Sequence, residues 1–283
     1  MIESITATVP VTGQSYTDLR PTISASSIEE YRQQLAEVGR LAGNDAFVER
    51  MLGPAKVDTT KLEKLCTDNG CVYFDHDSHA YYDSEGTQLM SGSKWSGQFE
   101  KPFDSEMVAK QVANKRLTTP DVVLKGWELK GDVSCTYGTA VHKAIECAIK
   151  YGEMPNNPHL LALVQDYMIA SEKDEQVSEQ FVLDLEHKIC GVIDVLVNKG
   201  NKHVVIRDFK TSDVYKKVSL TPEAKEKWNL KGELLSIYQL QLSFYAFILK
   251  NMGYKVDGLE IWAEAQEAWD VIKLPVLDIE EAL

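Results

Sequence analysis

Two aspartates and a lysine stand on neighbouring predicted strands of this chain. The segments Ile189–Val197 and His203–Phe209 are rich in apolar and β-branched residues, and an Asn-Lys-Gly-Asn turn separates them. Side chains alternate along a strand, so Asp208 and Lys210 point to the same face, roughly 7 Å apart. Folding the hairpin about its turn brings Asp194 opposite or diagonal to Asp208. We therefore expect two carboxylates and one ammonium group to converge at one end of a sheet.

The position of this convergence is expected to be buried. The run VVIRDFK, which ends at Lys210, is apolar on nearly every residue before its charged end, as is typical of a central strand covered on both faces. Charged groups in such a place are costly unless something binds there. A further strand over Gln180–Leu185 precedes the hairpin, and Glu179 stands at its start. By its position alone, Glu179 is a surface acid at a strand end.

A predicted helix adds a histidine to the candidates. Apolar residues recur at helical spacing from Val141 to Ile149, and Gly152 is placed to end the helix. His142 and Glu146 lie at i and i+4, just beside this apolar stripe. Taken alone, such a histidine is more often a core residue than a metal ligand.

A second predicted helix, Glu233–Met252, is apolar almost all round. Gln241 lies in the middle of one apolar stripe, which also contains Tyr245, and a side-chain amide is costly there unless it is hydrogen-bonded. Gln239 is an alternative polar partner, and a purely structural role for Gln241 stays open.

Four motifs follow one another in a fixed order. Gly-Thr-x-x-His-x-x-Ile-Glu ends at Glu146, Gly-x-x-Asp ends at Asp194, Asp-x-Lys ends at Lys210, and Gln-x-x-x-Tyr ends at Tyr245. In this order they resemble the RecB-like exonuclease branch of the PD-(D/E)XK nuclease superfamily, which includes the mitochondrial genome maintenance exonuclease and Cas4-type nucleases. The resemblance covers roughly residues 71–275. Each motif alone is weak evidence, whereas the four together are specific.

The resemblance implies an α/β fold, with a central mixed β-sheet flanked by helices as in restriction endonucleases. Residues 71–283 would form the nuclease domain, and residues 1–70 an N-terminal arm with a helical extension. The sequence itself favours further elements within this frame: helices from Ser26 to Leu41, at Ala46–Leu52, Thr59–Cys66, Met107–Arg116 and Val122–Lys130, a tyrosine-rich hairpin at Cys71–Ser93, and a closing hairpin at Leu259–Ala263 and Ala268–Leu274.

The resemblance also assigns roles to single residues. The implied catalytic residues are Asp194, Asp208, Lys210, Gln241 and Tyr245. The implied ligands of Mg²⁺ or Mn²⁺ are His142, Asp194, Asp208 and the carbonyl of Phe209. An imidazole ligand favours Mn²⁺ somewhat. Lys210 would orient or deprotonate the attacking water, Gln241 and Tyr245 would fix Lys210 or its strand, and Glu146 would stand behind the ligands. Several relatives have a glutamate near the position of Glu179, so the resemblance makes Glu179 an additional candidate for the site, and a surface acid at a strand end is an equal alternative. We expect no iron–sulfur cluster, because no cysteine follows Cys190.

The implied activity is that of a metal-dependent DNA exonuclease acting on ends or single strands in replication, recombination or repair. A structure-specific endonuclease is one alternative. A nuclease-fold binding or regulatory subunit of a DNA-processing complex is another, although such proteins usually lose the lysine or an aspartate. The motifs leave open the polarity, the choice between DNA and RNA, and the oligomeric state. DNA, with recombination or replication proteins, is the expected partner.

The charge distribution bears on how DNA would be bound. The net charge of −13 argues against a general nucleic-acid binder, because phosphate contacts need Lys and Arg. Between Lys199 and Lys231, however, basic residues exceed acidic ones, and the final segment from Asp257 to Leu283 is strongly acidic. The basic segment could guide a strand into the site, with Lys216 and Lys217 as phosphate contacts. An ordinary solvated loop explains the same segment equally well.

Composition limits the remaining choices. With 44% hydrophobic and 26% charged residues in 283, the chain is an ordinary globular one. No apolar run approaches the length of a membrane span, and the first residues lack the features of a signal or transit peptide. Five cysteines without a Cys-x-x-Cys pair fit a reducing compartment better than a disulfide framework. We therefore expect a cytoplasmic protein, bacterial or phage-encoded.

Overall fold

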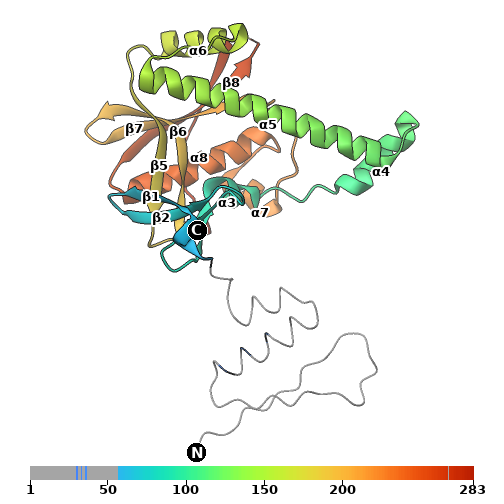
Figure 1. The fold of residues 1–283 in the computed structure, drawn as a ribbon, viewed down its shortest axis with the longest axis horizontal. Helices are drawn as coiled ribbons and strands as arrows, with labels where there is room; N and C mark the ends of the chain where they lie inside the picture. Colours follow the sequence, from blue (N-terminus) through green and yellow to red (C-terminus); the bar gives the residue numbers. More distant parts are fainter. Residues whose placement is uncertain (1–29, 31–32, 34–35, 37–56, 267) are drawn as a thin grey trace, which may run out of the picture. The chain divides into compact units, whose positions relative to one another are not determined.

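The computed structural model describes residues 30, 33, 36, 57–266 and 268–283 (Figure 1). Two units divide the chain: the first comprises Met1–Leu65 and Cys71–Leu89, the second Cys66–Gly70 and Met90–Leu283. Most of the helices expected before residue 57 lie outside the described residues, although Glu30, Gln33 and Ala36 are helical.

The described part of the first unit is mainly a β-meander. Strand β2 (Gly70–Asp75) pairs antiparallel with β3 (Ala80–Tyr82), with Tyr73 opposite Tyr82, as the tyrosine-rich hairpin predicted. β3 in turn pairs antiparallel with β4 (Gln88–Ser91).

The prediction of a helix over Thr59–Cys66 is wrong. Only a short 3₁₀ helix forms at Thr59–Lys61, and the chain then becomes extended as β1 (Glu63–Thr67). So short a segment has little helical stability of its own, and strand formation before the Asp-Asn-Gly turn overrides it. Cys66 and Cys71 are disulfide-bonded, whereas Cys135, Cys147 and Cys190 are free. The expectation of reduced cysteines therefore does not hold for Cys66 and Cys71.

A mixed β-sheet organises the second unit. The end of β4 pairs parallel with β6, β6 pairs antiparallel with β5 and β7, β7 pairs parallel with β8, and β8 pairs antiparallel with β9. The strands are β5 (Glu175–Asp184), β6 (Ile189–Gly200), β7 (His203–Lys210), β8 (Lys255–Ala265) and β9 (Ala268–Leu274). The three consecutive strands, the central place of the VVIRDFK strand and the closing hairpin are confirmed. The α/β fold class with a mixed sheet is confirmed as well.

Helices cover both faces of this sheet (Figure 1). The helices of this unit are α3 (Gly92–Gly97), α4 (Ser105–Arg116), α5 (Pro120–Tyr151), α6 (Pro158–Ala170), α7 (Pro222–Trp228) and α8 (Leu234–Asn251), of which α4 packs on α5 and not on the sheet. On one face, α5 and α6 pack on Phe209 and Trp262. On the other face, α8 packs on Ile206 and Ile261. The β7 strand that carries Asp208 is thus enclosed between two helical layers.

A buried arginine ties β7 to its neighbours. Arg207 Nε donates to Glu260 of β8 at 2.6 Å, and its Nη2 donates to Asp174 at 2.7 Å. The guanidinium also lies over the Trp262 ring, 5.1 Å from the ring centre. Burial alone would lower the pKa of Arg207, but its hydrogen bonds to Glu260 and Asp174 raise it, so the group stays charged.

Helix α5 is a single helix of 32 residues, where the sequence predicted two. Thr119 caps its start, Pro120 occupies the first turn, and Gly152 ends it with φ 69°. Gly126 and Gly131 lie within this continuous helix. A glycine in a helix costs only about 1 kcal/mol relative to alanine, and no proline interrupts the hydrogen bonds. None of the helices in the described part of the chain is long and apolar enough to cross a membrane.

Candidate metal centre

Asp194 and Asp208 converge where β6 meets β7. Val195 pairs with Arg207, so the two aspartates come next to each other in the ladder. The backbone N–H of Phe209 donates to Asp194 Oδ2 at 2.8 Å. The side chain of Asp208 is buried, with 4% of the residue exposed. The structure therefore brings together the two carboxylates that the strand pattern placed near one another.

Lys210 lies against Asp208. Its Nζ is 2.7 Å from Asp208 Oδ2, and the ring of Tyr238 from α8 covers it at 4.5 Å from the ring centre. Asp208 Oδ2 is itself buried, and the ammonium group of Lys210 is its charge partner. Burial raises the pKa of Asp208, the charge of Lys210 lowers it, and the charge of Asp194 raises it again. The resulting pKa is about 6. The charged carboxylate is therefore costly in this place, even with Lys210 beside it.

His142 approaches the two strands from α5. The helix passes close to the end of β7 at Gly138, where an added Cβ would lie 3.2 Å from Thr211 Oγ1. One turn later, His142 Nδ1 lies 3.3 Å from Asp194 Oδ2, and Nε2 lies 3.0 Å from the carbonyl oxygen of Phe209, to which it donates. The motif glycine therefore permits the approach that brings the imidazole to the strands.

The protonation of His142 follows from these contacts. Burial lowers the pKa of the imidazole, but the charge of Asp194 and the hydrogen bond to it raise the pKa more, to about 9. The pairing with His142 also lowers the pKa of Asp194. Burial would raise this pKa, but His142, Lys210 and the Phe209 N–H together lower it below its ordinary value. At neutral pH the pair is therefore an imidazolium and a carboxylate.

Glu179 completes a cluster with His142 and Asp194. One ligand atom from each of these three residues lies within 4.8 Å of the other two. Glu179 has φ 52° and is skipped in the ladder between β5 and β6, where Ser178 and Gln180 pair with Val195 and Ile193. The register is the same on both sides of this position, so Glu179 lies opposite Asp194. Burial, then the charges of Asp194 and Glu146, raise the pKa of Glu179.

Glu146 does not join this cluster. Its two carboxylate oxygens each accept from a lysine of the same helix, Lys143 at 2.7 Å and Lys150 at 2.7 Å. The pKa of Glu146 is lowered by these two hydrogen bonds. Its place, one turn beyond His142, agrees with a residue that stands behind the ligands.

Gln241 and Tyr245 lie differently from the expectation. Gln241 Nε2 donates to Tyr245 Oη at 3.1 Å, and the described contacts of Lys210 are with Asp208 and Tyr238 instead. The Tyr245 ring lies against the backbone of β6 at Gly191, where an added Cβ would be 2.4 Å from the ring. The pair thus supports the strand that carries Asp194, and Tyr238 is the aromatic partner of the lysine.

Substitution of Gly191 by alanine is expected to lower the free energy of unfolding by roughly 2 kcal/mol, because the new methyl group overlaps the Tyr245 ring. Chemical denaturation measures this directly. Gly258→Ala on β8 is the matched control, since its added Cβ has open space and its stability should be unchanged or slightly raised. Equal stability of Gly191→Ala and wild type would mean that the Tyr245 ring does not occupy this place.

Lys216 and Lys217 lie on the loop that follows β7, and both are exposed. Lys217 Nζ forms an ion pair of 2.6 Å with Glu233 at the start of α8. Val214, which is 2% exposed, anchors the loop in the core, and Tyr215 beside the lysines is 50% exposed. The structure therefore leaves Lys216 as the better candidate for a phosphate contact.

A second polar cluster was not anticipated from the sequence. Tyr137 Oη lies 2.7 Å from both His159 Nε2 and Glu264 Oε1, and His159 is 3.1 Å from the same carboxylate oxygen. These residues come from α5, α6 and β8. Burial, then Glu264, raise the pKa of Tyr137. The cluster fastens α5 to the sheet a little more than one turn before His142, so it fixes the helix that carries the histidine.

The residues at the junction fit a divalent cation. Three carboxylates, one imidazole and the Phe209 carbonyl offer hard oxygen donors and one nitrogen, a set that suits Mg²⁺ and Mn²⁺. The ligand atoms of His142, Glu179 and Asp194 all lie within 4.8 Å of one another, and Asp208, which is paired with Lys210 through Oδ2, lies beside Asp194 on the next strand. His142, Asp194, Asp208 and Glu179 are the side chains that would hold it.

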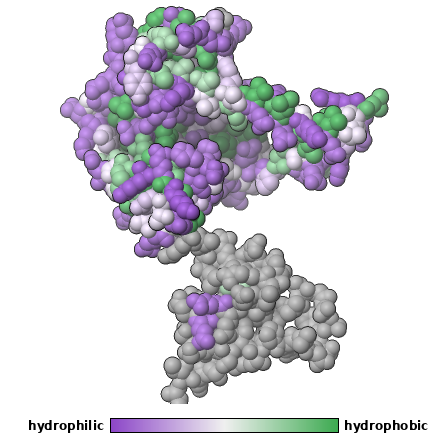
Figure 2. Space-filling view, viewed as in Figure 1, coloured by the Kyte–Doolittle hydropathy of each residue, from purple (hydrophilic) through white to green (hydrophobic). Residues whose placement is uncertain are grey.

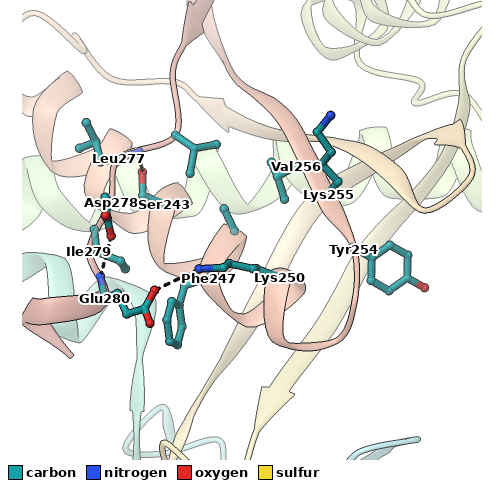
Figure 3. A pocket seen from close by; sticks show the side chains of 12 residues that line it. Ser243, Phe247, Lys250, Tyr254, Lys255, Val256, Leu277, Asp278, Ile279 and Glu280 are labelled. Atoms are coloured by element: carbon teal, nitrogen blue, oxygen red, sulfur yellow. Dashed lines mark hydrogen bonds and ion pairs between the residues drawn. The ribbon is translucent and has the colours of Figure 1, made fainter.

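A cavity of about 360 Å³ lies elsewhere in the second unit (Figure 3). It is formed by the C-terminal half of α8, the start of β8 and the last residues of the chain, where Leu277 N–H donates to Ser243 Oγ at 3.0 Å and Lys250 pairs with Glu280 at 3.0 Å. None of the residues of the candidate metal centre lines this cavity.

No model of a protein family matches the chain, and no curated protein matches it. What the chain does must therefore be inferred from the residues gathered at the junction of β6, β7 and α5.

Proposed function

We propose that this protein is a metal-dependent phosphodiesterase of the PD-(D/E)XK type that hydrolyses DNA at ends or in single strands. The observation that carries the proposal is the cluster of His142, Glu179 and Asp194, whose ligand atoms all lie within 4.8 Å of one another, beside the buried ion pair of Asp208 and Lys210. A charge arrangement so costly to fold is typical of a site that binds a cation and a charged substrate.

Hydrolysis of a phosphodiester needs a nucleophilic water and compensation of the charge that develops on the phosphate. Bound Mg²⁺ or Mn²⁺ would supply Lewis-acid polarisation and a water of lowered pKa. Asp194, Asp208, Glu179 and His142 would bind that ion. Lys210, with an ammonium group next to Asp208, would orient the attacking water and offset charge on the phosphate. Tyr238, over that ammonium group, limits its movement.

A metal-dependence assay on labelled DNA tests the proposal. With Mn²⁺ or Mg²⁺ we expect release of labelled product from linear single strands, and none in EDTA. Ca²⁺ should bind and support little turnover, because its looser geometry positions water poorly. Circular single strands distinguish the two modes: resistance indicates an exonuclease, and cleavage indicates an endonuclease. Absence of hydrolysis with every metal would favour the alternative of a nuclease-fold subunit without activity.

Lys216→Ala is expected to weaken binding of single-stranded DNA and to make the plot of log affinity against log salt shallower by about 0.7 of a unit, the value for one phosphate contact. Turnover at saturating substrate should be nearly unchanged. Lys217→Ala is the matched comparison: its ammonium group is already paired with Glu233, so its effect should be smaller. An unaltered salt slope in Lys216→Ala would place the path of the DNA elsewhere.

A further inference from the structure

The middle of α5 makes almost no contact with the rest of the described chain. Nine consecutive residues, 128–136, are exposed on all sides of the helix. On the N-terminal side of this stretch, Val123, Leu124 and Trp127 pack against α4. On the C-terminal side, Val141 and Ile145 pack on the sheet. In Figure 1, α4 and the first half of α5 extend away from the sheet. We call α4 and residues 120–136 of α5 the arm.

One side of the arm carries an apolar seam. Val122, Gly126, Leu129 and Val133 follow one another at intervals of four, three and four residues, the spacing of a helix that packs against a second helix. Val122, Leu129 and Val133 are 60%, 65% and 61% exposed. Figure 2 shows apolar residues at the surface of the arm. An added Cβ at Gly126 would meet no other atom within 4 Å, so nothing in the described chain requires a glycine there.

Two charged residues beside the seam distinguish antiparallel from parallel packing of two copies. Lys125 and Asp132 are seven residues apart and therefore flank the same side of it. If a second copy of the arm packs antiparallel about a two-fold axis, Lys125 of each copy faces Asp132 of the other. A parallel pair would instead bring Lys125 close to Lys130 of the second copy. The charges thus favour the antiparallel arrangement.

The shapes of the facing side chains also fit the antiparallel arrangement. Leu129 of each copy lies opposite Gly126 of the other, where the missing side chain leaves room for it. Val122 lies opposite Val133. Residues 119–127 of each copy, which α4 supports, then lie along the exposed residues 128–136 of the other.

We propose that a second copy of this chain docks on the apolar seam of α5, so that the protein forms a two-fold symmetric dimer through its arms. The dimer does not depend on the proposed nuclease activity. His142 is twenty residues after Val122, which at 100° per residue is about 200° around the helix. The seam and the candidate metal centre therefore lie on opposite sides of α5, and the dimer leaves the site open.

Charge reversal tests this arrangement with the full-length chain. In Lys125→Asp both flanking positions are acidic, and in Asp132→Lys both are basic. Because two-fold symmetry doubles each pair, either variant should raise the dimer dissociation constant about ten-fold or more. Sedimentation velocity should give the wild type twice the 31.8 kDa mass of the chain, and each variant a mass shifted toward the monomer. An equal mixture of the two variants should recover the dimer, because each then supplies the charge that the other needs.

The control is Glu128→Lys, which introduces a lysine on the exposed stretch but away from the seam, and it should behave as the wild type. A wild type that stays monomeric up to its solubility limit overturns the proposal, as does a mixture of the two variants that stays monomeric. A wild-type dimer that both variants leave unchanged would mean that copies associate through another surface, and it overturns the proposal equally.

Discussion

Asp208→Asn is expected to reduce hydrolysis by about 10³-fold or more, because it removes a cation ligand and the partner of Lys210. In metal-free protein the same change should stabilise the fold. The pKa of Asp208 is raised from 3.8 to about 6, so its charged form costs roughly 2–3 kcal/mol of folding free energy at neutral pH. That cost is absent below about pH 4, grows as the pH rises to about 6, and is constant above it. The gain from asparagine should follow the same course.

Lys210→Met is the informative companion to this variant. It should lose activity to a similar degree, because the ammonium group beside Asp208 is gone. Its effect on stability has the opposite sign, since Asp194 and Asp208 are left close together without that positive charge. Chemical denaturation in EDTA and a rate assay in Mn²⁺ give both values for each variant. Wild-type cleavage by either purified variant would contradict the assigned roles.

The affinity for Mn²⁺ is expected to rise about ten-fold per pH unit up to about pH 9, roughly a hundred-fold between pH 7 and pH 9. The pKa of His142 is raised to about 9, so below this pH the imidazole must release a proton before it can bind a metal. Calorimetry in two buffers of different ionisation enthalpy measures that proton directly.

His142→Asn serves as the control for the pH effect. It removes the titrating ring, so binding should be weaker at pH 9 and much less dependent on pH. Without metal, in EDTA, the stability of the wild-type fold should change with pH in the opposite direction from its Mn²⁺ affinity. A raised pKa means that the imidazolium stabilises the folded chain fully below about pH 6.5, and that this contribution is lost as the pH rises through 9. Unchanged Mn²⁺ affinity in the variant at pH 9 would make the histidine structural.

The sequence was most informative where local pattern determines structure. The strands around Asp194 and Asp208 alternate or run apolar over their whole length, and β6 and β7 form with the expected turn between them. Helix α8 could be predicted equally well, because its apolar residues recur over five turns. The convergence of the two aspartates follows from these elements and from the shortness of the turn.

Features that depend on tertiary contacts could not be obtained in this way. The continuity of α5 depends on its two ends being held, by α4 and by the sheet, and no local signal reports that. The contact of Tyr238 with Lys210 and the cluster around Tyr137 join residues that are far apart in the sequence. One expectation failed for a related reason, because the Thr59–Cys66 helix gave way to a strand. The hydrogen bond of Gln241 to Tyr245 is a further contact that the sequence could not specify.

The backbone at Glu179 has a consequence for how this protein can change. A residue with a side chain at φ 52° costs about 1–2 kcal/mol relative to a relaxed strand, and the mutual repulsion of Glu179 and Asp194 adds to that cost. Glycine would relieve both, and it would remove the carboxylate from the cluster. Selection for a more stable fold and selection for cation binding therefore act in opposite directions on position 179. Variants chosen for thermal resistance alone should accumulate glycine there and lose metal affinity as they do.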